Sequence, residues 1–144
     1  FIRNLAENTM WSIWFRAGGP HANCRLRRAV HLAAEARLRE AGRGLGRLID
    51  DYPEFAEAYH QRAIVYFLLG RYARARRNLI ETLRRNPMHF AALAGLGHCY
   101  AAEGKWAKAL SWYKRAARLH PTAEGLSEAI DELNRLVGPP ASAR

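Results

Sequence analysis

The sequence predicts an all-α fold, a right-handed solenoid of stacked helical hairpins. Proline recurs every 34 residues, at Pro53, Pro87 and Pro121. Other columns at the same spacing each keep one class of side chain. They are Ala41/Ala75/Ala109, Ala29/Ala63/Gly97, Leu32/Tyr66/Tyr100, Leu38/Tyr72/Trp106 and Ala36/Gly70/Gly104. A fixed period of this kind is the signature of a repeat array. We therefore expect three hairpins, the first of them degenerate.

The repeats span residues 22–53, 54–87 and 88–121, and each is predicted to hold two helices. In the middle repeat, apolar and aromatic residues at spacings of three and four predict one helix from Pro53 to Leu69 and a second from Tyr72 to Arg85. Glycine between them suits a helix end, because it takes the left-handed conformation without strain. Each repeat is thus a helical hairpin with a tight joint.

A cap helix is expected at each end of the array, because terminal units of a solenoid need a polar outer face. Residues 1–17 form the N-terminal cap, with Trp11 and Trp14 available for burial. Residues 122–137 form the C-terminal cap, and residues 138–144 are a tail. The whole chain, 1–144, is then a single domain.

Composition restricts the class of protein further. No apolar run reaches the length of about 18 residues that spans a bilayer, so we expect a soluble protein, cytoplasmic or exported if an upstream signal was removed. Cys24 and Cys99 fit no ligand spacing and are expected to be core thiols. The net charge of +10 favours acidic partners, although arginine also serves simply as a helix former on exposed faces.

Catalytic motifs are missing from the sequence. No HExxH, GxSxG or GxxxxGK[ST] pattern occurs, and the six histidines do not cluster along the chain. The spacing of Gly42, Gly44 and Gly46 is similar to that of a nucleotide-binding glycine loop, but no predicted strand precedes these residues. We therefore predict a protein that is not an enzyme, with no catalytic residue, no metal and no cofactor.

The repeat resembles the tetratricopeptide repeat family, whose helix–turn–helix unit has the same period. The third repeat carries the whole family pattern, with Leu93, Leu96-Gly97, Tyr100, Ala109, Tyr113, Ala116 and Pro121. The middle repeat departs from it at Arg62-Ala63, where Leu-Gly is usual, and at Thr82. More narrowly, the run from Glu57 to Ala63 resembles an uncharacterised bacterial and plastid subgroup of such proteins.

The resemblance implies a concave groove, lined by the first helix of each pair, that holds a peptide or helix. By repeat column, the groove residues here are Arg27, Val30, Glu57, His60, Gln61, Ile64, Phe67, Leu68, Ala94, His98 and Ala101. Some family members clamp the C-terminal carboxylate of heat-shock chaperones with Lys, Asn and Arg. The corresponding columns hold Leu26, Val30, Gln61, Ala91 and Gly95, so the sequence disfavours that partner.

A non-catalytic module that binds a protein or peptide, possibly an acidic one, is the function we predict from these observations. One alternative is anion or nucleic-acid binding through an outer basic ridge, comprising Arg71, Arg74, Arg76, Arg77, Arg84 and Arg85. On the expected exposed face, aromatic residues are not interleaved with these arginines, which disfavours nucleic acid. The other alternative is a scaffold that self-associates into a homo-oligomer through exposed tryptophans.

Overall fold

The computed structural model describes residues 2–138, with side chains from Thr9 onward. Every regular element of this part of the chain is a helix, which confirms the all-α class. The helices are α1 (Ile2–Arg16), α2 (Gly19–Ala34), α3 (Leu38–Asp51), α4 (Ala56–Leu68), α5 (Tyr72–Arg85), α6 (Phe90–Ala102), α7 (Trp106–Leu119) and α8 (Leu126–Val137). Among the described residues, none of these helices has both the length and the apolar character to cross a membrane.

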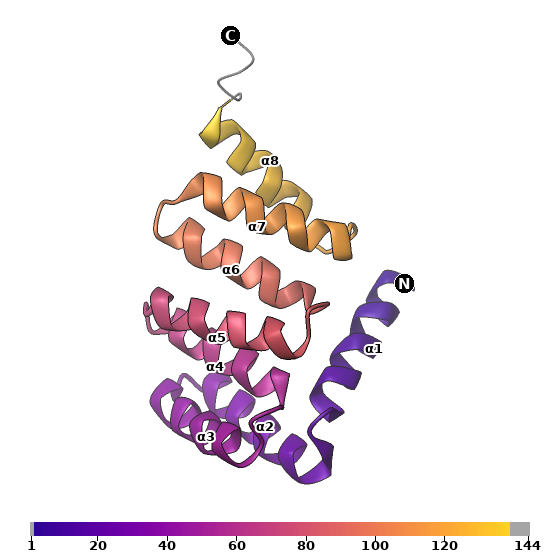
Figure 1. Cartoon of the computed structure of the whole chain (residues 1–144), viewed down its shortest axis with the longest axis vertical. Coiled ribbons are helices and arrows are strands. Elements are labelled where there is room, and N and C mark those ends of the chain that lie inside the picture. Colours follow the sequence, from indigo (N-terminus) through magenta and orange to yellow (C-terminus); the bar gives the residue numbers. More distant parts are fainter. Residues whose placement is uncertain (1, 139–144) are drawn as a thin grey trace. The chain divides into compact units, whose positions relative to one another are not determined.

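The chain divides into two compact units, Phe1–Pro87 and Met88–Arg144. In the first, α2 packs on α3, α3 on α4 and α4 on α5, and α1 lies against α2 and α4 (Figure 1). In the second, α6 packs on α7 and α7 on α8. Neighbours in sequence are therefore neighbours in space within each unit, as in a repeat array.

The joints between paired helices lie at the repeat column that the sequence predicts, Ala36/Gly70/Gly104. Gly70 and Gly104 adopt positive φ angles of 72° and 73°, which end α4 and α6 with a left-handed residue. Ala36 stands in the same column and adopts a φ of 61°, although an alanine Cβ makes this conformation unfavourable. The degenerate first repeat thus keeps the geometry of the joint but lacks its glycine.

The core of the first unit joins three helices and the loop before α4. Its buried residues are Ala22, Leu26, Ala29, Ala41, Leu45, Leu48, Ile49, Phe55, Ala58, Tyr59 and Val65, and Phe15 of α1 packs against them. In the second unit the repeat columns supply the buried residues Leu93, Leu96, Ala109, Tyr113 and Ala116. Small residues at these columns let paired helices approach closely.

Candidate binding surfaces

The predicted inner face of α4 keeps two apolar side chains in contact with solvent. Ile64 is 38% exposed and Leu68 is 56% exposed, and their spacing of four residues places them on one side of the helix. Phe67 is half-buried, with its ring 5.3 Å from that of Tyr72. The exposed edge therefore consists of Ile64 and Leu68, whereas Phe67 also serves the packing of α4 on α5.

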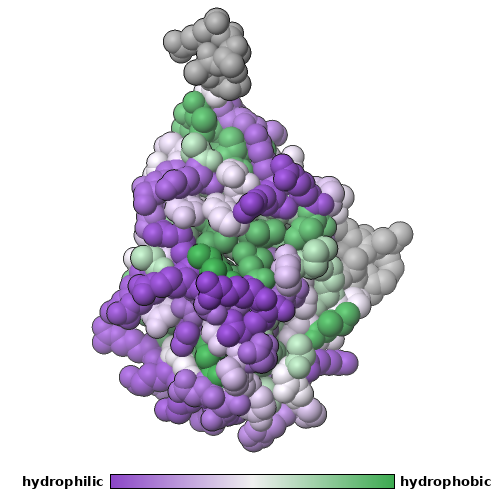
Figure 2. All heavy atoms as spheres, in the orientation of Figure 1, coloured by the Kyte–Doolittle hydropathy of each residue, from purple (hydrophilic) through white to green (hydrophobic). Residues whose placement is uncertain are grey.

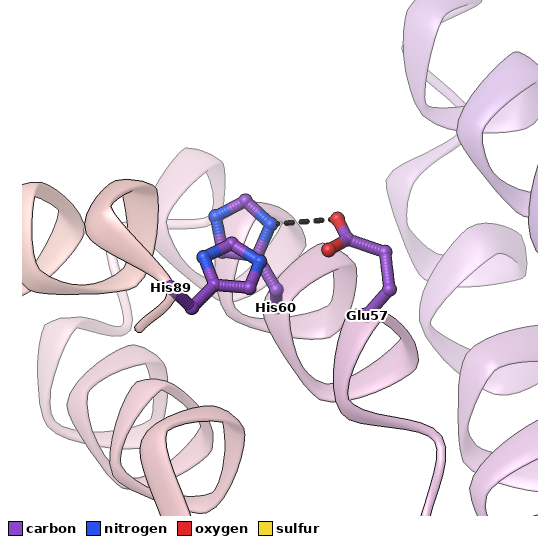
Figure 3. A group of neighbouring side chains, drawn as sticks. All are labelled: Glu57, His60 and His89. Carbon is purple, nitrogen blue, oxygen red and sulfur yellow. Dashed lines mark hydrogen bonds and ion pairs between the residues drawn. The ribbon is translucent and has the colours of Figure 1, made fainter. Parts of the chain in front are cut away.

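Glu57 and His60 differ from the prediction, which made them hydrogen-bonding groups of an open groove. They are only 1% and 4% exposed. His60 Nδ1 lies 2.8 Å from a Glu57 carboxyl oxygen (Figure 3), and Gln61 Nε2 donates to the same oxygen at 2.9 Å. An ionised carboxylate only accepts, so with Glu57 ionised Nδ1 carries the proton of the first bond. Both bonds lie within α4, and the buried Glu57 and His60 do not face an open groove.

Helix α1 covers part of the same face. The ring of Trp11 lies 5.7 Å from that of His60, and Trp14 meets Trp11 edge-on at 5.1 Å. On the neighbouring α2, Arg27 stays exposed and Val30 is half-buried. The repeat columns predict which residues face inward, but they contain no information on where a helix outside the repeats will lie.

In the second unit, the inner face of α6 carries His98. The residue as a whole is exposed to solvent. Its Nδ1 lies 2.6 Å from the hydroxyl oxygen of Tyr113 on α7. Desolvation lowers the pKa of His98, and burial, followed by the nearby Cys99, raises the pKa of Tyr113 to about 12. Both groups are therefore neutral near pH 7, and the imidazole tautomer decides which of them donates. Ala94 and Ala101 are half-buried on the same helix.

The basic ridge is only partly the surface that the sequence predicts. Arg71, Arg74, Arg77 and Arg84 are exposed, and Arg76 is half-buried. Arg85, by contrast, turns inward, with 17% of its side chain exposed. It donates from Nε to the Pro53 carbonyl at 2.6 Å and from Nη1 to Glu81, and it lies 4.0 Å over the Tyr59 ring. Arg85 is therefore a packing residue.

A hollow of about 630 Å³ opens beside the ridge. Its lining residues are Arg62, Tyr66, Arg74, Arg77, Asn78, Ile80, Glu81 and Arg84, all from α4 and α5. On the face that Figure 2 shows, hydrophilic side chains form a band over α5. The sequence prediction missed Arg62 as a member of this surface, although its departure from the usual leucine was a signal.

The prediction of two core thiols is right for Cys99, which is buried, and wrong for Cys24, which is exposed. The buried residues of α2 are Ala22, Leu26 and Ala29, and Cys24 lies on the opposite side of that helix, two residues away from Ala22 and Leu26. It lines a second hollow of about 460 Å³ together with Arg16 of α1.

The paired helices, with small residues at their crossings, define a helical-repeat protein. Its inner edge is apolar and its outer hollow is basic. The tetratricopeptide repeat family matches residues 60–124 of the sequence. This part of the chain therefore carries the tetratricopeptide repeat that the 34-residue period predicts.

Two curated relatives contain the matching region within longer chains. A TPR repeat-containing protein of Rhizobium etli is 26% identical over 81 residues, which cover 56% of this chain and 40% of the relative. Anaphase-promoting complex subunit 6 of Arabidopsis thaliana is 32% identical over 104 residues, which cover 70% of this chain and 19% of the relative. This chain thus spans less than half the length of either relative.

Solved structures share the fold at low sequence identity. The first TPR domain of human RPAP3 superposes with a TM-score of 0.78 at 21% identity and covers 83% of this chain and 94% of that chain. The Yersinia enterocolitica type III secretion chaperone SycD was solved in complex with a peptide of the translocator YopD. It superposes with a TM-score of 0.74 at 12% identity and covers 79% of this chain and 92% of that chain. The first TPR of Spaghetti (RPAP3), bound to the HSP90 peptide SRMEEVD, superposes with a TM-score of 0.76 at 19% identity. It covers 81% of this chain and 92% of that chain.

Proposed function

We propose that the chain is a non-catalytic interaction module whose inner helix faces bind a helical or extended segment of another protein. In the first unit the contact surface is the exposed edge of α4, Ile64 and Leu68, with Gln61 and Phe67 beside it. In the second unit the corresponding surface is α6, with Ala94, His98 and Ala101. Exposed apolar side chains between polar groups are typical of surfaces that accept partner side chains.

The observation that carries this proposal is the position of α1. This helix lies on the surface made by α2 and α4, with Trp11 against His60 and Phe15 against the core. The inner face of the first unit therefore already accommodates one helix of the chain itself, through Trp11 and Phe15. Ile64 and Leu68 remain exposed on the same helix, and burying a leucine or isoleucine contributes about 1.5–3 kcal/mol.

The solved structures support peptide binding as the class of function but not a particular peptide. RPAP3 and SycD were both solved with peptides bound. Their sequence identities of 19% and 12% establish the fold alone. The columns of the chaperone-tail clamp hold Leu26, Val30, Gln61, Ala91 and Gly95 in this chain, and none of these is a cation. We therefore propose a different segment as the partner.

A capture experiment with matched variants tests the proposal. Wild-type protein, the double variant Ile64→Ser/Leu68→Ser, and Leu136→Ser would each be immobilised and exposed to an extract of the source cells. Leu136 is 53% exposed on α8, so its replacement removes a similar apolar surface from a helix outside both proposed surfaces. We expect a protein that wild type and Leu136→Ser retain and that the double variant loses. Equal retention by all three proteins would contradict the proposal.

Peptides that tile the captured protein would then locate the bound segment. For the best peptide we expect Leu68→Ser to weaken binding by about tenfold, corresponding to the loss of one buried side chain. Fluorescence anisotropy of the labelled peptide measures this change. A variant with unchanged affinity would place the contact away from the edge of α4.

A further inference from the structure

The basic hollow between α4 and α5 is a second surface, separate from the proposed inner face. On α4 its residues are Arg62 and Tyr66, whereas the inner edge consists of Ile64 and Leu68. Two residues advance an α-helix by about 200°, so these two sets point to opposite sides of α4. Whatever occupies the hollow can therefore bind while the inner edge is occupied.

Arg62 is a feature of this repeat that its fold does not require. The next repeat has Leu96 in the same column, and that leucine is 1% exposed. The arginine is fixed in place by a nearly buried amide: Arg62 Nε donates to Asn78 Oδ1 at 2.7 Å, and Asn78, 7% exposed, donates to the Arg74 carbonyl at 2.9 Å. The two Nη groups take no part in this bond. A guanidinium positioned in advance loses less entropy when a ligand arrives.

The hollow has a surplus of positive charge. Four of its lining residues are arginines and one is a glutamate, an excess of three. The Glu81 carboxylate is already bonded to Arg84 and Arg85, each at 2.7 Å, and the hydrogen bond from Arg85 lowers its pKa, so it stays ionised. Within residues 9–138, Arg74 and Arg77 have no carboxylate within ion-pair distance. An anion is the ligand that this arrangement accepts.

One aromatic ring stands among the arginines, contrary to the expectation from the sequence. Tyr66 lines the hollow, and the Arg74 guanidinium lies 5.8 Å from its ring centroid. Nucleic-acid grooves present successive rings for base stacking, whereas here a single half-buried ring is already approached by a guanidinium. Ile80, 43% exposed, adds an apolar contact. These features favour an anionic group on a peptide over a nucleic acid.

We propose that this hollow binds a phosphorylated side chain of a protein partner. A phosphate monoester carries a charge of about −2 near neutral pH and offers three acceptor oxygens, which several guanidinium forks can share. A single carboxylate offers less charge and only two oxygens. The hollow, at about 630 Å³, lies within the range of about 300–1,000 Å³ found for ligand sites. Arg62, Arg74 and Arg77 supply the donors, and Ile80 contacts the flanking residues.

Fluorescence anisotropy with a defined probe tests the site. The probe is a labelled nine-residue peptide of Gly, Ala and one phosphoserine, compared with its unphosphorylated twin and with a labelled single-stranded DNA ten-mer. The protein variants are Arg62→Leu, which restores the usual residue of the repeat, and Arg77→Gln. Arg71→Gln is the matched control, because it removes the same charge from an exposed residue outside the lining. Thermal melts followed by circular dichroism establish that each variant folds.

We expect the phosphopeptide to bind at least tenfold more tightly than its twin. Arg62→Leu and Arg77→Gln should each weaken it about tenfold, the scale of a lost charge-assisted contact, while Arg71→Gln changes it less than about twofold. Equal loss in all three variants would show diffuse charge attraction and overturn the site. Tighter binding of the DNA than of the phosphopeptide, lost in the same variants, would assign the hollow to nucleic acid instead. Ile64→Ser/Leu68→Ser should leave phosphopeptide binding intact, which separates this test from that of the inner edge.

Discussion

The ring of Tyr113 on α7 fills the space where a side chain at Gly97 on α6 would stand. A Cβ built on Gly97 would come within 2.6 Å of two ring atoms of Tyr113. Tyr113 is 4% exposed, and its hydroxyl is bonded to His98, so the ring cannot easily move away. The crossing of α6 and α7 therefore depends on this glycine.

Gly97→Ala should consequently destabilise the protein. We expect a loss of about 1–3 kcal/mol, the usual effect of overpacking a filled core, measured by urea unfolding. Gly44→Ala is the control, because Gly44 lies within α3 and a Cβ there meets nothing within 4 Å. That substitution should stabilise the protein by about 0.5–1 kcal/mol through helix propensity. If both substitutions acted in the same direction, the close approach of Tyr113 would not be the cause.

Ala36→Gly should stabilise the joint between α2 and α3. Ala36 adopts a φ of 61°, a conformation that disfavours a residue with a Cβ by about 1–2 kcal/mol. Glycine relieves this strain at some entropic expense, so we expect a gain of about 1 kcal/mol or less. Gly70→Ala, at the equivalent joint with a φ of 72°, should change stability in the opposite direction. Thermal melting of the pair measures both, and a lower melting temperature for Ala36→Gly would contradict the strained joint.

Arg85→Ala should be far more damaging than Arg84→Ala, although the two residues are adjacent. The Arg85 side chain is 17% exposed, bonded to Pro53 and Glu81 and placed over Tyr59, whereas that of Arg84 is 69% exposed. We expect a loss of about 1–3 kcal/mol for Arg85→Ala, because the Pro53 carbonyl loses a charged donor, and below about 1 kcal/mol for Arg84→Ala. Chemical denaturation distinguishes them, and equal losses would show that Arg85 does not turn inward.

His98 should make the protein less stable in mild acid. Desolvation lowers its pKa in the folded state below the ordinary value of 6.5. The unfolded chain then binds a proton more readily, so stability falls as the pH drops through about 6.5 and stops falling below the folded pKa. His98→Asn removes this dependence. We expect the difference in unfolding free energy between pH 7.5 and pH 5 to be larger for the wild type, as measured by parallel urea titrations. Identical pH profiles would contradict this role of His98.

Local pattern was enough to predict most of the fold. Tyr72 and Arg85 are the predicted ends of a helix, and α5 begins and ends at these residues. Gly70 and Gly104 adopt the left-handed conformation that their column predicts. Helix periodicity and helix ends depend on residues within a few turns of each other, so a repeated sequence reports them directly. The family resemblance, applied by repeat column, placed Ile64 and Leu68 on an inner groove surface, and both side chains are exposed.

Contacts between residues far apart in the sequence decided the rest. The sequence by itself determined the hairpins, their joints and the side of each helix that packs. Only the tertiary structure showed that Trp11 of α1 lies against His60, that Glu57 is buried and that Arg85 turns onto Tyr59. It also brought Arg62 of α4 together with Arg77 of α5 around one hollow. These relationships depend on how whole helices pack, and the free energy of that packing is shared among many side chains, so no single motif encodes it.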